Sequence, residues 1–334
     1  MLNAYAIADH CLVEHPASVS DLVLKKAVWL DLIEPSPQEE ARVESILRFD
    51  IPTRGELAEI EASSRLYQED GACFMTANLI RRGDDDRPES SPVTFILKDK
   101  QLITLRYHHP QAFPQYVKQA MRQVEAGDAW GVFISLIEAV VDRGADHLER
   151  VGQIVEETSR QVFATSFLRK PKPGTKRPPK RNLERLLGKV GEEGDFTSKM
   201  RESLVSISRM MAYAQVLVDG QAAGKSKRDN LARIKILQRD ILSLTDHATF
   251  LSGKISFLLD AVLGMISIEQ NNIIKIFTVA SVAFLPPTLI ASIYGMNFKL
   301  IPELQWDFGY FYAVALMIGS ALLPIWYFRR KGWF

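Results

Sequence analysis

The apolar positions divide the chain into three parts with different patterns. Residues 1–125 contain short apolar runs separated by turn signals, and residues 126–275 carry long helical periodicities. The third part, 276–334, contains two apolar runs without charge, 276–294 and 308–328. A helix of about 20 apolar residues can span a bilayer. We therefore expect an α/β cytosolic domain, a long-helix region and a transmembrane hairpin.

Helix caps and short strands indicate the α/β class for the first part. Capping boxes that begin at Ser36 and Thr53 predict two helix starts. Runs of apolar and β-branched residues predict strands, and the tight Asp99-Lys100 connection predicts a hairpin between the last two. The predicted strands are Ala27–Ile33, Ala72–Ile80, Val93–Leu97 and Leu102–Arg106.

A heptad-type apolar stripe runs through the end of the second part. Its members alternate steps of three and four residues, and no proline interrupts the stretch before Pro286. This spacing predicts one continuous helix over about 227–294, roughly 100 Å long. Such a helix needs partners, either from its own chain or from other copies. The stripe consists of Leu237, Ile241, Leu244, Ala248, Leu251, Ile255, Leu258, Val262 and Met265.

The stretch before this helix contains three breaks in the pattern. Prolines and like charges in 169–181 prevent a packed helix and predict an exposed loop. This loop either contacts anionic lipid or an acidic partner, or is simply solvated. A helix resumes near Asn182, and glycines at 191–194 leave an interruption open. A second break at 219–224 precedes the long helix.

The net charge, the cysteines and the histidines of the chain disfavour several classes of function. The net charge of the 334-residue chain is +1, so nothing points to nucleic acid. Cys11 and Cys73 are the two cysteines, and we expect free thiols in a reducing compartment. The first residues show no signal peptide. His108 and His247 lack metal-ligand companions, and no pattern predicts a catalytic site or an organic cofactor, so we expect no enzyme.

Basic residues flank the two apolar runs. Lys275 precedes the first run, and Arg329, Arg330 and Lys331 follow the second. The positive-inside tendency places both flanks in the cytosol, and with them both termini. The connecting segment, 295–307, then lies outside. A buried hairpin in a soluble core is disfavoured because both runs lack charge and their outer flanks are basic.

One face of the first apolar run suits the lining of a pore. It is polar at its cytosolic end, apolar in the middle and polar again near its outer end. Apolar constrictions can gate by dewetting, and polar rings near the mouths hold hydrated ions. The same spacing also suits a helix-packing face, and the residues alone leave both interpretations open. The face comprises Asp260, Gly264, Ser267, Asn271, Ile274, Phe277, Ser281, Leu285 and Thr288.

The segment Gly295-Met296-Asn297 begins the connection between the two runs. Magnesium gives up its water reluctantly, so a channel can avoid the dehydration cost by binding the hydrated ion. Neutral acceptors repeated around an axis meet this need. The amide oxygen of Asn297, with carbonyls near Gly295, could form such a ring. Since one Asn cannot select an ion, this chemistry implies an oligomer.

The sequence Tyr-Gly-Met-Asn-Phe at 294–298, followed by a short loop and a second apolar run, resembles the signature of the CorA family of divalent-cation channels. Leu285-Pro286-Pro287-Thr288 and Pro302-Glu303-Leu304 resemble its enterobacterial-type branch. The resemblance implies a homopentamer whose first apolar helix lines the pore, with the second helix around it and a funnel of long helices in the cytosol. It also implies that the Gly-Met-Asn ring binds hydrated magnesium. Magnesium held by cytosolic acids would favour the closed state.

By position, the resemblance assigns roles to single residues. The acids that hold regulatory magnesium cannot be placed in this way, and Asp240 and Asp246 are guesses based on their helix. The assigned roles are a selectivity mouth (Gly295, Met296, Asn297), a polar ring (Thr288), an apolar neck (Leu285, Phe277, Ile274), an inner-funnel face (Asp260) and a basic collar (Lys275, Arg329, Arg330, Lys331).

Two features depart from the family pattern. Lys299 stands where many relatives carry an acid, which leaves Glu303 and Asp307 as the acids of the outer loop. A ring of lysines should repel cations at the mouth. The basic, proline-rich loop at 169–181 is the second departure.

The leading hypothesis is a homopentameric, multi-pass channel of the bacterial inner membrane. It would carry divalent cations, chiefly magnesium and also cobalt and nickel, and its partners would be its own copies, the lipid bilayer and these ions. One alternative is a zinc transporter of the same superfamily, which the intact Met296 disfavours. The other is a membrane scaffold that has lost conduction, which Lys299 and the basic loop would favour.

Overall fold

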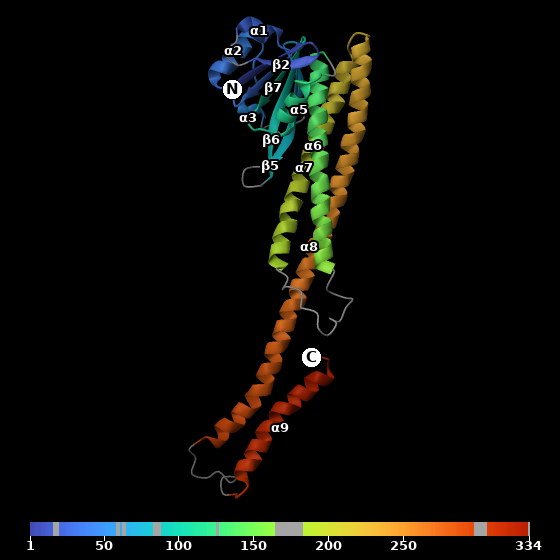
Figure 1. The fold of residues 1–334 in the computed structure, drawn as a ribbon. Helices are drawn as coiled ribbons and strands as arrows, with labels where there is room; N and C mark the ends of the chain where they lie inside the picture. The colour runs from blue at the N-terminus through green and yellow to red at the C-terminus, as the bar shows by residue number, and fades with distance from the viewer. Residues whose placement is uncertain are drawn as a thin grey trace. The chain divides into compact units, whose positions relative to one another are not determined.

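The computed structural model describes residues 1–15, 20–57, 61, 65–82, 88–124, 127–163, 183–296 and 306–332. They form two compact units, Met1–Leu259 and Asp260–Phe334. The first unit contains a sheet and most helices, and the second contains the end of the long helix and the last helix (Figure 1). In chain order the elements are β1 (Leu2–Ala8), β2 (Cys11–His15), α1 (Asp21–Lys26), β3 (Trp29–Ile33), α2 (Pro37–Leu47), α3 (Arg54–Leu57), β4 (Leu66–Glu69), β5 (Ala72–Arg82), β6 (Pro88–Lys98), β7 (Gln101–Arg106), α5 (Ala112–Ala120), α6 (Ala129–Phe163), α7 (Leu183–Asp219), α8 (Lys225–Tyr294) and α9 (Gly309–Arg330).

The described strands form one sheet in the order β2-β1-β3-β7-β6-β5-β4. The central pair, β3 and β7, is parallel, and the other neighbouring pairs are antiparallel. Helices α1 to α3 cover one face, and α5 to α7 lie on the other (Figure 1). This layered α/β arrangement confirms the predicted fold class for the N-terminal part.

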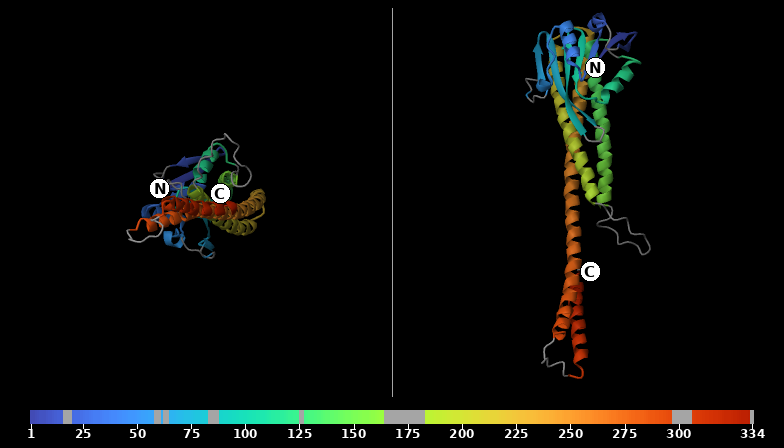
Figure 2. Two further views of the ribbon diagram at one scale, coloured as in Figure 1. Left: turned by 90° about the horizontal axis from the view of Figure 1, so that it is seen from below. Right: turned by 90° about the vertical axis from the view of Figure 1, so that its left-hand side faces the viewer.

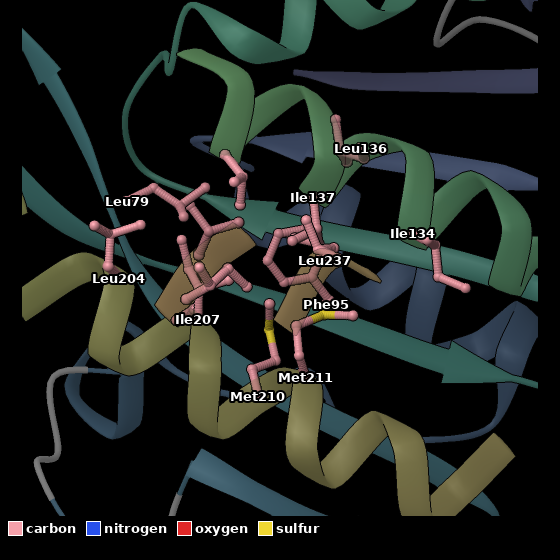
Figure 3. Close-up of a cluster of buried hydrophobic side chains, with 14 of the residues drawn as sticks. Leu79, Phe95, Ile134, Leu136, Ile137, Leu204, Ile207, Met210, Met211 and Leu237 are labelled. Carbon is pink, nitrogen blue, oxygen red and sulfur yellow. The ribbon is translucent and has the colours of Figure 1, made fainter. Parts of the chain in front are cut away.

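Two hydrophobic clusters fill the two sides of the sheet because successive strand residues point to opposite faces. On β3, Leu30 belongs to the cluster under α1 and α2, whereas Trp29 belongs to the cluster under α5 and α6. The second cluster also takes in α7 and the first part of α8, where Met211 and Leu237 meet the Phe95 region of the sheet (Figure 3). The first part of α8 is thus anchored in the first unit.

A buried polar network crosses the central strands. The Asp31 carboxylate accepts hydrogen bonds from Arg106 Nε at 3.1 Å and Nη2 at 2.9 Å, and from the Thr104 hydroxyl at 2.7 Å. Thr104 in turn accepts from Trp29 Nε1 at 3.0 Å. A buried carboxylate is costly unless it is paired and hydrogen-bonded. Here the parallel pairing of β3 with β7 supplies those partners.

Most local signals in the first part are confirmed. Ser36 and Thr53 each form the reciprocal capping box, with Glu39 and Glu56 as partners. The hairpin through Asp99 joins β6 to β7. Strands β1, β2 and β4 were not predicted. Both cysteines are free, as expected.

The interruption left open at 191–194 is absent, and α7 runs unbroken from Leu183 to Asp219. The reason lies in tertiary packing. A Cβ atom on Gly194 would lie 3.2 Å from Ile255 Cγ2, so glycine permits a close approach of α7 to α8. Packing here outweighs the low helix propensity of glycine. The predicted loop at 169–181 lies outside the described residues.

The long helix is confirmed, since α8 extends over 70 residues and contains Pro286 and Pro287. The heptad stripe is its buried side: Ile241, Ala248 and Leu258 are fully buried. The break before the helix is also confirmed, because no helix covers residues 220–224. The sequence pattern therefore located both the course of this helix and its inward face.

Candidate functional site

The second unit holds the candidate ion pathway. Two described helices, α8 and α9, are long and apolar enough to cross a membrane. Within this unit the end of α8 and α9 run alongside each other (Figure 2). The length of the apolar segments suits a bilayer of about 30 Å.

One face of α8 packs toward α9. Val279 and Ala283 are the buried positions, with exposed fractions of 6% and 9%. Around them lies an apolar groove of about 560 Å³ that both helices line, with Ile276 and Pro287 from α8 and Ile325 from α9 among its walls. Small residues at this face allow close helix approach, as is usual in membranes.

The predicted pore-lining positions lie on the opposite face. At roughly 100° per residue, the line from Asp260 to Thr288 is centred about 150° around the helix from the α9 face. Its apolar members Ile274, Phe277 and Leu285 are 60%, 69% and 66% exposed. The polar members Asp260, Ser267, Asn271, Ser281 and Thr288 are exposed as well. The packing of α8 on α9 therefore uses a different face, and this line lies exposed among the residues that the structure describes.

Two hydroxyl groups on this line are oriented by their own helix. Thr288 donates to the Phe284 carbonyl at 2.8 Å, and Ser267 donates to the Leu263 carbonyl at 3.1 Å. Each hydroxyl has one proton and two lone pairs. Since the proton is engaged, what remains for a ligand is acceptor capacity, which suits a cation and its water shell.

The outer end of α8 is tightly wound around Gly295. Its amide donates to the Ala291 carbonyl at 2.9 Å, and the Met296 amide donates to the Ile293 carbonyl at 3.3 Å. A Cβ atom on residue 295 would lie 3.1 Å from the Ala291 oxygen, so a larger residue would crowd the helix end. Asn297, Lys299 and Glu303 lie outside the described residues.

The predicted basic collar occupies exposed positions at the ends of the charge-free segments. Lys275, Arg329, Arg330 and Lys331 are all exposed. Arg330 lies over the Trp326 ring and Lys331 over the Tyr327 ring, each 5.3 Å from the centroid. Aromatic and basic side chains together are typical of a membrane–water interface.

The guessed regulatory acids, Asp240 and Asp246, are both exposed on α8 in the first unit. Asp240 acts on another acid: burial raises the pKa of Asp142 on α6, and the charges of Asp146 and Asp240 raise it further. Among the described residues, no three His, Cys, Asp or Glu side chains are placed to hold a metal ion. The structure thus relates Asp240 to a repulsive acidic group on α6.

Asp142 and Asp146 belong to a candidate acidic group, with Asp240, that the sequence predictions did not name. Their spacing of four puts them on one face of α6, and that spacing was visible in the sequence. What could not be seen was that α8 brings Asp240 to the same place. That arrangement depends on the packing of two helices far apart in sequence.

Comparisons with known proteins agree on one family. The family model described as "CorA-like Mg2+ transporter protein" matches residues 25–175 and 180–330. The magnesium transport protein CorA of Pasteurella multocida is 36% identical over 335 residues, and that of Escherichia coli K12 is 35% identical over 334 residues. Each alignment covers 100% of both chains. The solved structure of the CorA magnesium transporter from Methanocaldococcus jannaschii has a TM-score of 0.71 at 18% identity, covering 100% of this chain and 99% of that chain.

Proposed function

This chain belongs to the CorA-like Mg2+ transporter family, and on that premise we propose that it forms a homopentameric channel for magnesium uptake. The observation that carries the proposal is the exposed line on α8. It lies on the far side of the helix from α9 and ends at the Gly295 turn. In an oligomer, copies of this face would surround a common axis, while α9 would lie outside.

The line offers the two functions that a pore needs. Ile274, Phe277 and Leu285 would form an apolar neck that resists water when it is narrow. Ser281 would lie within this neck. Thr288 above it, and Asn271, Ser267 and Asp260 below it, would accept hydrogen bonds from the water shell of an ion. The proposal is that magnesium passes with its waters attached, since their removal is costly.

Selectivity is proposed to reside in the Gly295-Met296-Asn297 mouth. The support is twofold: the motif resembles that of the family, and a Cβ atom at Gly295 would lie 3.1 Å from the Ala291 oxygen, so a side chain there would require the helix end to shift. The Asn297 amide oxygens of several copies would hold the hydrated ion. Cobalt and nickel are proposed as further cargo because their divalent ions also carry a water shell.

Closure is proposed to depend on intracellular magnesium held by acidic side chains. The Asp142 group, with Asp146 and Asp240, supports this, because burial raises the pKa of Asp142 and the like charges of Asp146 and Asp240 raise it further. A divalent cation would relieve that repulsion. Asp246 remains a guess based on its helix.

Transport is proposed to occur across the bacterial inner membrane, with both termini and the basic collar in the cytoplasm. The driving force needs no nucleotide hydrolysis. A membrane potential of about 100 mV is worth about 2.3 kcal/mol per charge, so a divalent ion that enters the cell at this potential releases roughly 4.6 kcal/mol of free energy. The collar of Lys275 and Arg329 to Lys331 would face the anionic inner leaflet.

Growth of a magnesium-transport-deficient bacterial strain tests the function. We expect the wild-type gene to restore growth at low magnesium, and Asn297→Ala to fail although the protein reaches the membrane as an oligomer. If the wild-type protein is present in the membrane without rescue, magnesium transport is wrong. If the protein instead raises zinc uptake without restoring growth at low magnesium, the chain transports zinc.

A further inference from the structure

A polar groove of about 700 Å³ lies in the first unit, between α7 and strands β4 to β6. It shares no residue with the ion pathway of the second unit. Its size falls in the range of small-ligand sites, about 300–1,000 Å³. The proposed transport function gives it no role.

Hydrogen bonds between α7 and β5 fix the floor of the groove. The Ser203 hydroxyl donates to the Asn78 carbonyl at 2.6 Å, and the Asn78 amide donates to the Ser206 hydroxyl at 3.1 Å. The Asn78 side chain also donates to Glu202 Oε1 at 3.3 Å. The backbone amide and carbonyl of Asn78 on β5 are thus both bonded to α7. The groove is therefore formed before any ligand arrives.

Among the described residues that line the groove, positive charges outnumber negative ones. Three arginines line it, Arg65 from the strand side and Arg201 and Arg209 from α7, against one carboxylate, Glu202. Arg65 is held toward the floor by a hydrogen bond to Asn78 Oδ1 at 3.3 Å. In the described part of the chain, Arg201 and Arg209 make no hydrogen bond or ion pair, and both are exposed. Two guanidinium groups thus face the groove with their donors free.

The spacing of these arginines suits an elongated anion. Arg201 and Arg209 are eight residues apart on one helix, which is about 12 Å along its axis. A guanidinium group binds phosphate oxygens through two parallel hydrogen bonds. The hydroxyls of Ser90 and Ser198 add further donors to the lining. Among the described lining residues there is no aromatic ring on which a base could stack.

We propose that this groove binds a small anion with two or more linked phosphate groups, through Arg65, Arg201 and Arg209. The phosphate chain is the recognised part, whether it is free or belongs to a nucleotide. An acidic segment of a second copy of this chain is the rival occupant, and the test below separates the two.

Isothermal titration of the full-length protein in detergent and EDTA provides the test, with sodium tripolyphosphate as the probe. We expect saturable binding to the wild-type protein. Arg201→Glu and Arg209→Glu should each weaken it at least tenfold, and the milder Arg201→Gln should weaken it severalfold. The matched control is Arg150→Glu, which replaces an exposed arginine on α6 outside the groove and should change affinity less than twofold.

Two further probes identify the source of the phosphates. ATP should compete with tripolyphosphate at similar affinity, and adenosine should not bind. The proposal is overturned if the wild-type protein does not bind tripolyphosphate, if adenosine binds as well as ATP, or if Arg150→Glu weakens binding as much as Arg201→Glu. It is also overturned if the folded Arg201→Gln and Arg201→Glu proteins bind normally, or if they lose their oligomeric state, which would make the groove an interface between copies.

Discussion

The two halves of α8 present apolar residues to opposite surroundings. From Lys225 to Leu259 a heptad stripe of apolar residues lies buried, as Ile241 does at 0% exposure, whereas Ile236, Leu242, Phe250 and Phe257 lie exposed off this stripe. From Asp260 onward, apolar residues of the same size lie open, as Ile274 does at 60%. One continuous helix therefore buries an apolar stripe within the first unit and, among the described residues, leaves most large apolar side chains of its second half exposed.

The difference shows where the chain depends on other molecules. Burying one large apolar side chain is worth about 1.5–3 kcal/mol, so a long exposed apolar segment is unfavourable in water. In the first half, the heptad stripe finds its partners within the first unit. In the second half, the proposed channel would supply lipid on some sides, further copies on others and an aqueous path along the polar–apolar–polar face.

The largest expected effect is on the free energy of unfolding, when an isoleucine in each half of α8 is replaced by alanine. Ile241→Ala should destabilise the first unit by about 2–5 kcal/mol, because it leaves a cavity in a packed core. Ile274→Ala, the matched control on the exposed face, should cost less than about 0.5 kcal/mol. Chemical denaturation followed by tryptophan fluorescence measures both. Equal losses would show that Ile274 is packed in a core and would remove the contrast.

A pH dependence is expected from the first unit. Burial lowers the pKa of His108 to about 4, and the charges of Arg106 and Arg81 act in the same direction. The unfolded chain binds this proton near pH 6.5. The contribution of the neutral His108 to the free energy of unfolding is therefore complete above about pH 6.5 and falls as the pH drops from there toward about 4. The total loss is about 3 kcal/mol.

Thermal unfolding of the full-length protein between pH 7.5 and 4 checks this dependence. His108→Asn should flatten the profile over that range. His247→Asn, which removes an exposed histidine on α8, should leave it unchanged. A profile that keeps its slope without His108 would assign the pH dependence to other groups.

The turn at the outer end of α8 gives a smaller effect, on transport. Gly295→Ala places a methyl group about 3.1 Å from the Ala291 oxygen, so the helix end must shift. We expect magnesium uptake to fall about tenfold, or about 1.4 kcal/mol, with the oligomer intact. Gly253→Ala, on the same helix with open space around its Cβ, serves as the control. Normal uptake by the Gly295 variant would mean that this turn does not position the mouth.

The smallest effect is expected at Lys299, an outer-loop residue known only from the sequence. Lys299→Glu should raise the apparent affinity for magnesium severalfold at low ionic strength, because it replaces a repulsive charge with an attractive one. The gain should shrink as salt is added, since exposed charges are screened within about 10 Å at 0.1 M salt. An unchanged affinity at low salt would show that this side chain does not sense the permeating ion.

The fold was predictable where the signals were local. The capping boxes at Ser36 and Thr53, the Asp99 hairpin and the course of α8 all follow from short-range spacing. Strands β1 and β2 were missed because Asp9 and His10 form their turn with positive φ angles of 50° and 59°, whereas Asn-Gly or Asp-Gly is the usual signal. Strand β4 was detectable, since Asp70-Gly71 carries that signal.

The candidate site divides in the same way. Helix periodicity alone predicted that the residues proposed to line the pore share one face of α8; their role in a pore stays a prediction. Which of two faces packs on α9 could not be predicted, and the structure assigns that role to Val279 and Ala283. The approach of Asp240 to Asp142 and the arginine groove depend on tertiary packing, which no short-range pattern encodes.

The most direct test of the account compares the two faces of α8 by silver-ion block of magnesium uptake. In reconstituted protein with Cys11 and Cys73 replaced by serine, Leu285→Cys places a thiol on the exposed line and Ala283→Cys places one on the α9 face. The account predicts that external silver ions block uptake through Leu285→Cys and leave Ala283→Cys unaffected. Block of Ala283→Cys with no effect on Leu285→Cys would place the water-filled path on the other face and contradict the account.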